Sequence, residues 1–285
     1  MFIISQSTRQ VLDEEERQDE LNRILRDRLN GTVLVPFPPE DVDEPAVLDL
    51  GYGKGAWIDD LLAEYGDCVV TGVDIFLGDD VDEDAVEEED NDTVEEFIKK
   101  RWNLNAPFAQ DRSESRLRPE TFDLINCRCL AEGIDRDRWP ALIGELKRLL
   151  KPGGRIQMAE AYYCFQSDNG RLAESSVSNA WWSWYNRFMD ISGRDARIGR
   201  QLERYCQAQG FEQIVATQYR MSIGGWEPGR ASLGRQIRHN LLQLMGSFAV
   251  PFVRTAGMPP QVCRQVGVGA REELSRDDIK AYYVM

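Results

Sequence analysis

The chain has 285 residues, of which 42% are hydrophobic, enough for one large α/β domain with a packed core. Its net charge of −15 argues against a nucleic-acid-binding protein, which would carry clustered Lys and Arg for the phosphates. No stretch approaches the roughly 20 apolar residues of a membrane span, and the apolar N-terminal stretch is shorter than a secretory signal. We therefore expect a cytoplasmic protein without membrane contact.

A helix is expected first, over residues 13–31. Leu21, Ile24, Leu25 and Leu29 recur there at helical spacing, and Gly31 ends the pattern. A Pro-rich connector follows, and residues 45–165 then alternate apolar strands with helical patterns. The expected strands are 46–50, 68–76, 121–130 and 155–165, and the expected helices are 56–66 and 137–154. This alternation predicts an α/β fold, a mostly parallel sheet with helices on both faces.

Between the second and third of these strands lies an acidic segment, residues 79–96. Twelve of its eighteen residues are Asp or Glu, and without them the net charge would be −3. Such a block resists burial and is typical of a solvated loop. The alternative is a docking surface for a basic protein partner.

The last part, residues 171–285, is less regular. The segment 180–190 places Trp181, Trp184, Tyr185 and Phe188 on one helical face, either as core or as the wall of a pocket for a flat apolar acceptor. Further helices are expected at 196–210, 231–247 and 259–274, and strands at 211–223 and 280–285. Helices inserted between the last two strands indicate a substrate-side lid within a single domain, residues 1–285.

The six cysteines show neither C-x-x-C spacing nor neighbouring histidines: Cys68, Cys127, Cys129, Cys164, Cys206 and Cys263. This pattern is typical of reduced thiols, and it predicts neither a disulfide framework nor a metal site.

The most informative motif is "AVLDLGYGKGAW", residues 46–57. It lacks the G-x-x-x-x-G-K-[ST] pattern of a phosphate loop, but Gly51, Gly53 and Ala56 can be aligned with a dinucleotide loop. It also fits acid-x-G-x-G-x-G, with Asp49 two residues before Gly51. A carboxylate there would attract a ligand's ammonium group and repel a pyrophosphate. Asp74, at the end of the next strand, is placed to accept from ribose hydroxyls with either ligand.

The downstream order separates the two ligands. A "FDLI" strand followed by "LLKPGGRIQMAE" resembles class I S-adenosylmethionine-dependent methyltransferases. From about residue 13 to the end, the chain resembles the fungal LaeA-type methyltransferase-domain proteins of secondary metabolism. The segments that carry this likeness include "EEERQDELNRIL", "RWNLNAPF", "FDLINCRCLAEGI" and "GMPPQVCRQVGVGAREELSRDDIKAYYV". The resemblance implies a Rossmann-like, seven-stranded sheet and S-adenosylmethionine as cofactor, with S-adenosylhomocysteine as product.

The resemblance also implies a set of cofactor-binding residues. The implied residues are Asp49, Gly51, Tyr52, Gly53, Gly55, Asp74, Ile75, Asn103, Leu104, Asn126, Cys127 and Arg128. Asp49 and the glycines 51, 53 and 55 would wrap the methionine end of the cofactor. Asp74 would hold the ribose, and Asn103 would accept a hydrogen bond from the adenine amino group. Asn103 stands where the family usually has aspartate, and Asn126 where many relatives have histidine.

Methyl transfer needs alignment of the nucleophile and exclusion of water, and it needs a base only for a protonated nucleophile. Three candidates for the acceptor side are Glu160, at a strand end, His239, the one histidine, and Tyr163. Each also has a structural interpretation, as a loop-bonded acid, a hydrogen-bonded helical residue and a sheet-capping residue, respectively.

The sequence thus favours an enzyme that methylates an O, N or C nucleophile of a small metabolite, and the 180–190 face would suit an apolar or aromatic one. One alternative is a LaeA-like regulator that acts through protein partners. Another keeps the bound sulfonium as a fixed charge for a cyclisation or elimination.

Overall fold

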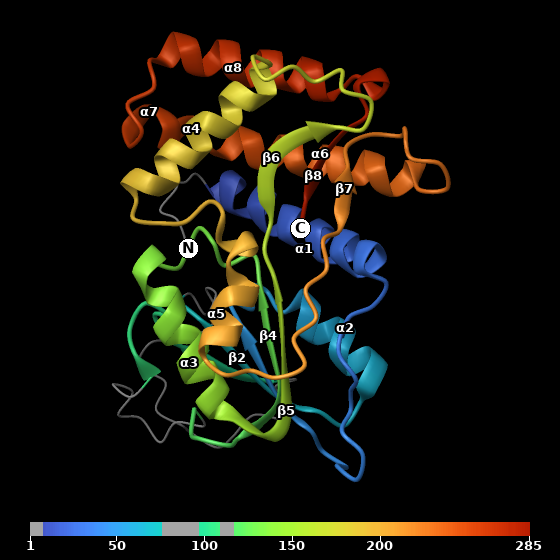
Figure 1. Cartoon of the computed structure of the whole chain (residues 1–285), viewed down its shortest axis with the longest axis vertical. Helices are drawn as coiled ribbons and strands as arrows, with labels where there is room; N and C mark the ends of the chain where they lie inside the picture. Colours follow the sequence, from blue (N-terminus) through green and yellow to red (C-terminus); the bar gives the residue numbers. More distant parts are fainter. Residues whose placement is uncertain (1–7, 76–96, 109–116) are drawn as a thin grey trace.

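A parallel five-stranded sheet forms the centre of the molecule (Figure 1). The computed structural model describes residues 8–75, 97–108 and 117–285. The acidic segment 79–96 lies outside these residues, and so does the hypothesis that it docks a basic protein partner. The strand order is β3-β2-β1-β4-β5. The strands are β1 (Ala46–Leu50), β2 (Val69–Asp74), β3 (Ile98–Arg101), β4 (Phe122–Arg128) and β5 (Leu150–Ala159).

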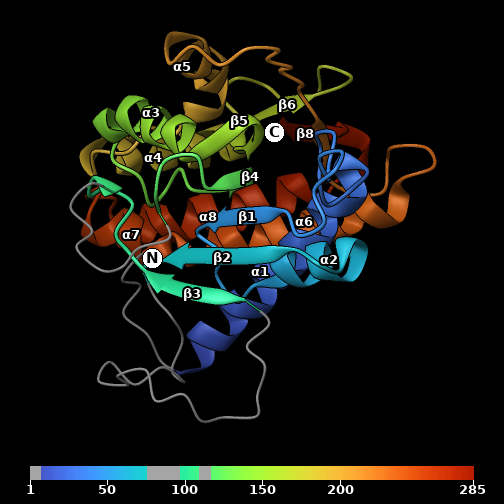
Figure 2. The same cartoon turned by 90° about the horizontal axis from the view of Figure 1, so that it is seen from below.

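Both faces of this sheet are covered, as the continuous apolar runs predict. Successive residues of β1 pack on opposite sides: Val47 belongs to the cluster around Ile58, and Leu48 to the cluster around Leu142. The two helices involved are α2 (Ala56–Tyr65) and α3 (Trp139–Leu149), which carries Pro140 in its first turn. Figure 2 shows the five strands side by side with these helices on either side.

A second, antiparallel sheet lies beside the first, in the order β6-β8-β7. Its strands are β6 (Tyr162–Ser167), β7 (Arg220–Ser222) and β8 (Ala281–Val284). The expected single sheet of seven strands is therefore wrong: five parallel strands and three antiparallel strands form separate sheets. The expected strand 155–165 divides at Glu160, where the chain leaves the parallel sheet.

Two other strand predictions need correction. Of the expected strand 211–223, only Arg220–Ser222 pairs with a neighbour, and most residues of 212–219 are exposed. Strand β3 was missed because its four residues, "IKKR", are one apolar residue followed by three basic ones, a pattern that resembles a loop, and the strand lies at a sheet edge. The helix expected at 137–154 ends at Leu149, and "LKPGG" already belongs to β5, with an irregular register against β4.

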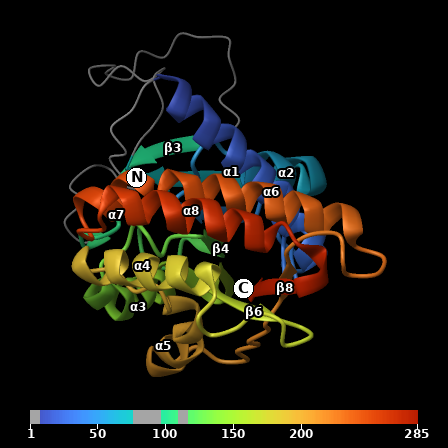
Figure 3. The same ribbon diagram turned by 90° about the horizontal axis from the view of Figure 1, so that it is seen from above.

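A layer of helices covers the carboxyl end of the parallel sheet (Figure 3). It consists of α1 (Thr8–Leu29), α4 (Val177–Ile191), α6 (Ala231–Ser247), α7 (Ala249–Arg254) and α8 (Pro260–Leu274). Helix α6 lies between α1 and α8, and α8 lies between α6 and α4. The predicted helical insertion between the last two strands is confirmed, since α6, α7 and α8 separate β7 from β8. The expected helix 196–210 is a 3-10 turn (Ile198–Arg200) followed by α5 (Leu202–Ala208).

The N-terminal helix α1 is longer than expected and begins at Thr8. Its inner side carries the buried residues Ile24, Leu25 and Leu29, which follow the periodicity seen in the sequence. Over the described ranges, no helix combines the length and the apolar character needed to cross a membrane.

Candidate functional site

The glycine loop lies at the carboxyl end of β1, where open parallel sheets bind their ligands. Gly51, Gly53 and Gly55 have φ angles of +70°, +60° and +93°, values that side-chain-bearing residues rarely adopt. The Gly51 amide donates to the Val73 carbonyl (2.7 Å), and the Gly53 amide donates to Oδ2 of Asp74 (3.1 Å). The loop is thereby folded against the end of β2, next to the second predicted acid.

Side chains from other elements also pack closely on the loop. A Cβ atom on Gly51 would lie 2.4 Å from Cδ2 of Leu130, and one on Gly53 would lie 3.1 Å from Oε1 of Gln18. Gln18 belongs to α1, so this helix stands directly over the loop. Asn22 of the same helix donates to the Ala56 carbonyl (3.0 Å) and to Oδ2 of Asp60 (2.8 Å). Helix α1 therefore holds the start of α2 beside the glycine loop.

A ladder of buried polar side chains crosses β1, β4 and the edge strand β5 beside the loop. Asp49 in β1, Asn126 in β4 and Gln157 in β5 are register partners. Nδ2 of Asn126 donates to Oδ1 of Asp49 (2.7 Å), and Nε2 of Gln157 donates to Oδ1 of Asn126 (2.7 Å). Gln157 also accepts from the Leu34 amide (2.8 Å). The ladder fixes the orientation of the Asp49 carboxyl from strand to strand.

Asp49 and Arg128 place opposite charges close together at this edge. Burial raises the pKa of Asp49 to about 7, while Arg128 and the hydrogen bond from Asn126 oppose that rise. Arg128 lies over the Trp57 ring (5.8 Å to the centroid), and its Nη2 donates to Oδ1 of Asn22 (2.7 Å). Its Nε is buried without a hydrogen-bond partner in the described structure. The Asp49 carboxylate can accept from the ammonium group of an amino acid, and Nε of Arg128 can donate to its carboxylate.

The remaining predicted cofactor residues lie around the same loop and the following strand end. Tyr52 is buried in edge-to-face contact with Phe97 (5.2 Å between centroids), and Ile75 is exposed just after β2. Oδ1 of Asn103 accepts from the Asn105 amide (3.0 Å), and an amide oxygen keeps a second lone pair for a ligand. Leu104 beside it is buried, and its carbonyl accepts from Nε of Arg138 (3.0 Å).

Glu160 fixes the loop that follows β4. Its Oε1 accepts from the Leu130 amide (2.7 Å) and its Oε2 from the Ala131 amide (3.2 Å). Burial raises the pKa of Glu160 to about 8, against the effect of these hydrogen bonds. The chain turns toward Glu160 at Cys129, which has a φ of +55°. Backbone strain of this kind collects at functional sites, where the surroundings enforce it.

A buried polar cluster lies beyond this loop, and sequence reasoning missed its central residue, Glu132. The Tyr185 hydroxyl donates to Oε1 of Glu132 (2.6 Å), and Tyr163 packs edge-to-face on Tyr185 (5.6 Å). Burial raises the pKa of Glu132, and Tyr185 and Arg17 oppose the rise. Glu132 follows Arg128, the last residue of β4, by four residues in "RCLAE". Its closeness to the strand end was the sequence signal that could have marked it as a site residue. Arg17 carried no local signal, because only the tertiary fold brings α1 here.

Two other candidates have ordinary surroundings. His239 is exposed on α6, with its Nε2 3.1 Å from Nε2 of Gln243, and no carboxylate accompanies it among the described residues. Cys127 is buried in β4, and burial raises the pKa of its thiol well above the usual value. The structure therefore brings Asp49, Asp74, Asn126 and Arg128 together with the glycine loop, and it places His239 on the outer side of a helix.

Comparison with known proteins points to one family. The family described as "Methyltransferase domain" matches residues 15–216. The chain is 27% identical to the methyltransferase pytC of Aspergillus terreus, over 95% of this chain and 78% of that protein. It is 23% identical to the secondary metabolism regulator LAE1 of Cochliobolus heterostrophus, over 94% and 84% of the two chains. A solved SAM-dependent methyltransferase from Archaeoglobus fulgidus is 17% identical over 96% and 97% of the two chains, with a TM-score of 0.43.

Proposed function

The chain belongs to the methyltransferase-domain family, and from this premise we propose that it methylates a small secondary metabolite at the strand ends beneath α1. Its methyl donor is S-adenosylmethionine. The observation that carries the proposal is the meeting of the glycine loop, Asp49, Asp74 and Arg128 at one sheet edge. Similarity to pytC, named a methyltransferase, and to tdiE of Emericella nidulans, named a probable methyltransferase, supports an enzyme of specialised metabolism.

In this proposal, the chain's own residues bind and orient the donor. The glycine loop follows the methionine end, Asp49 faces its ammonium, Arg128 faces its carboxylate, and Asp74 accepts from the ribose hydroxyls. Tyr52 and Ile75 flank the sugar, and Asn103 and Leu104 flank the adenine. S-adenosylmethionine supplies an electrophilic methyl group, which is bonded to its sulfonium sulfur. Methyl transfer is a displacement at carbon, so the nucleophile of the acceptor must be aligned with the methyl group in place of solvent.

The acceptor would enter between the loop after β4 and helix α4. Glu160 is a positioning residue there, because backbone amides occupy both of its oxygens. Glu132, held by Tyr185 and next to Tyr163, is the carboxylate that can orient an acceptor hydroxyl or amine. We give His239 no part in the transfer, since it is exposed on α6 beside Gln243.

The affinity for S-adenosylmethionine should depend on pH through Asp49. A bound ammonium favours the charged carboxylate, so a proton leaves Asp49 on binding below its pKa of about 7. Affinity should rise up to about tenfold per pH unit toward pH 7 and fall again above about 8, where the ligand's own amine loses its proton. Calorimetry across this range checks the curve. In Asp49→Asn the rise in affinity toward pH 7 should disappear. An unchanged rise would show that Asp49 does not contact the ligand.

Arg128 should be required for the ligand's carboxylate and for no other part of it. We expect Arg128→Gln to weaken S-adenosylmethionine about tenfold or more, the range of a charge-assisted hydrogen bond. Decarboxylated S-adenosylmethionine, which lacks only that group, should bind the variant and the wild type about equally well. Equal losses for both ligands would show that Arg128 supports the fold of the site and leaves the carboxylate to another residue.

Transfer itself is tested with a labelled methyl donor. The protein is incubated with it and a small-molecule extract of the producing organism, and products are read by mass. A labelled small molecule that depends on the protein supports the enzyme. Label in protein alone would favour the regulator, the role named for LAE1, and the matched control for both outcomes is Gly53→Asp.

A further inference from the structure

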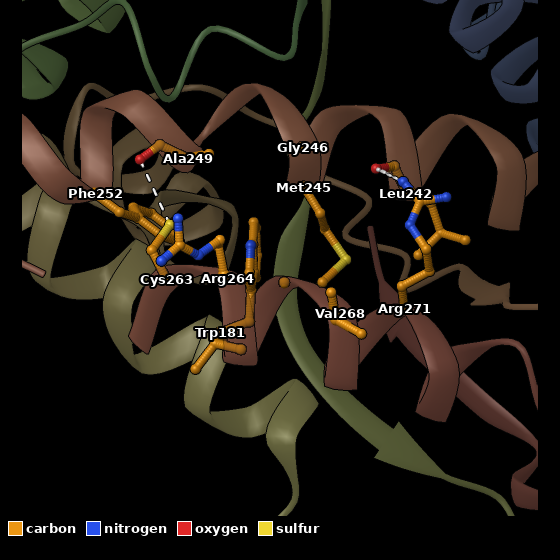
Figure 4. Close-up of a pocket in the computed structure, with 12 residues that line it drawn as sticks. Trp181, Leu242, Met245, Gly246, Ala249, Phe252, Cys263, Arg264, Val268 and Arg271 are labelled. Carbon is orange, nitrogen blue, oxygen red and sulfur yellow. Dashed lines mark hydrogen bonds between the residues drawn. The ribbon is translucent and has the colours of Figure 1, made fainter. Parts of the chain in front are cut away.

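The helical layer contains a hollow away from the glycine loop. A cavity of about 260 Å³ lies among α4, α6, α7 and α8 (Figure 4). Its walls are mainly apolar and include Trp181, Leu242, Met245, Phe252, Val266 and Val268. The volume is just under the roughly 300–1,000 Å³ of ordinary ligand pockets, so it suits a small ligand.

Two glycines open this cavity between facing helices. Gly246 in α6 and Gly267 in α8 line it, and a Cβ atom added to either would meet nothing within 4 Å. Alanine at such helix positions would be favoured by roughly 0.5–1 kcal/mol over glycine. Both glycines are exposed, so the hollow opens to solvent at these positions, and a side chain at either one would narrow that opening.

The charge of the lining is unusual for this acidic protein. The cavity is lined by Arg264 and Arg271 and by no carboxylate, although the net charge of the whole chain is −15. Arg271 donates to the Leu242 carbonyl (3.4 Å). The Arg264 side chain is exposed at the rim of the hollow, and it makes no hydrogen bond or ion pair within the part of the chain that the structure describes. Figure 4 shows Arg264 beside Trp181 and Cys263, and Arg271 at the other end beyond Met245 and Val268.

We propose that this cavity binds a small apolar carboxylate, with its alkyl body between Trp181, Met245 and Val268 and its head group on Arg264. Apolar walls account for the body, and a cation without a protein partner accounts for the head. Arg271 is the less suitable partner because its Nη2 already donates to the Leu242 carbonyl, which leaves fewer of its donors for a ligand. Trp181 stacks on Tyr185 (5.4 Å between centroids), whose hydroxyl binds Glu132, so the ligand would contact the layer next to the proposed acceptor site.

Octanoate is the first probe, titrated into the full chain and followed by calorimetry and tryptophan fluorescence. We expect saturable binding that is about fifteenfold tighter than that of hexanoate, because octanoate has two more methylenes and each one buried contributes about fourfold. Octanol, with the same chain and no charge, should bind at least tenfold more weakly. Trp181→Phe should remove the fluorescence change and keep the calorimetric signal. Absence of saturable octanoate binding to the folded wild type, or equal binding of octanol, would overturn the proposal.

Three variants locate the ligand. Arg264→Gln should weaken octanoate at least tenfold, whereas Arg271→Gln, the matched change at the other end, should alter it less than threefold. Gly267→Leu should fill the hollow and abolish binding, and Gly267→Ala should reduce it less. Circular dichroism and thermal melting confirm that each variant is folded. Octanoate binding that survives Gly267→Leu, or that falls only in Arg271→Gln, would contradict the assignment. S-adenosylmethionine binding in the same samples tests the proposed function separately.

Discussion

Gly53→Asp should abolish the stabilisation of this protein by S-adenosylmethionine. Gly53 has a φ of +60°, and a Cβ atom there would already lie 3.1 Å from Oε1 of Gln18. Aspartate would add a carboxylate next to Asp74, whose Oδ2 accepts from the Gly53 amide. At a ligand concentration of about 100 times Kd, the wild type should gain about 2.7 kcal/mol in the free energy of unfolding. The variant should gain nothing measurable at the same concentration.

Gly229→Asp is the matched control. Gly229 also has a positive φ, +76°, but a Cβ atom there meets nothing within 4 Å, and the residue lies in the turn before α6. The same backbone strain and the same added charge should then leave ligand binding unchanged. If both variants lose the ligand-induced stabilisation, or if neither does, the glycine loop is not the binding element.

Glu160→Ala should destabilise the protein by roughly 2–4 kcal/mol, because it leaves two buried backbone amides without an acceptor. These are the amides of Leu130 and Ala131, in the loop that turns at Cys129. Urea unfolding at about pH 6 measures the loss. Glu160→Gln retains one carbonyl acceptor and should lose about half as much. An alanine variant as stable as the wild type would show that the loop holds its conformation without Glu160.

The same residue predicts a pH dependence of stability. Its folded pKa of about 8 lies above the ordinary glutamate value of 4.5, so between these values the folded state binds more protons than the unfolded state. Stability therefore falls as pH rises through this window, by at most about 1.4 kcal/mol per pH unit for one group. Asp49 has the same sign up to about pH 7. Between about 7 and 8 the slope should be nearly lost in Glu160→Gln, and a slope equal to that of the wild type would contradict the assignment.

The parallel sheet could be predicted because its signals are local. The apolar run 46–50 marks β1, the glycines after it mark the turn into α2, and Pro140 marks the start of α3, whereas the end of α3 at Leu149 and the edge strand β3 were not predicted. The second sheet could not, because β7 and β8 pair over about 60 residues of intervening chain, and three-residue strands have no periodicity. The end of β5 depends on Glu160, whose partners lie in another loop.

The candidate site shows the same division. The motif "LDLGYGKG" places Asp49 and the glycines, and counting to the next strand end places Asp74. The ladder from Asp49 through Asn126 to Gln157 depends on strand register, which the sequence does not specify for strands buried on both faces. Arg17 and Gln18 reach the site only because α1 folds back over the sheet, so the residues that cover the loop became evident only in the structure.

The most direct test of the central claim is a calorimetric titration of the purified chain with S-adenosylmethionine and with S-adenosylhomocysteine. The structure predicts saturable one-to-one binding of both ligands to the wild type, and no binding of either to Gly53→Asp, whose fold is checked by circular dichroism. A folded wild-type protein that binds neither ligand would contradict the account.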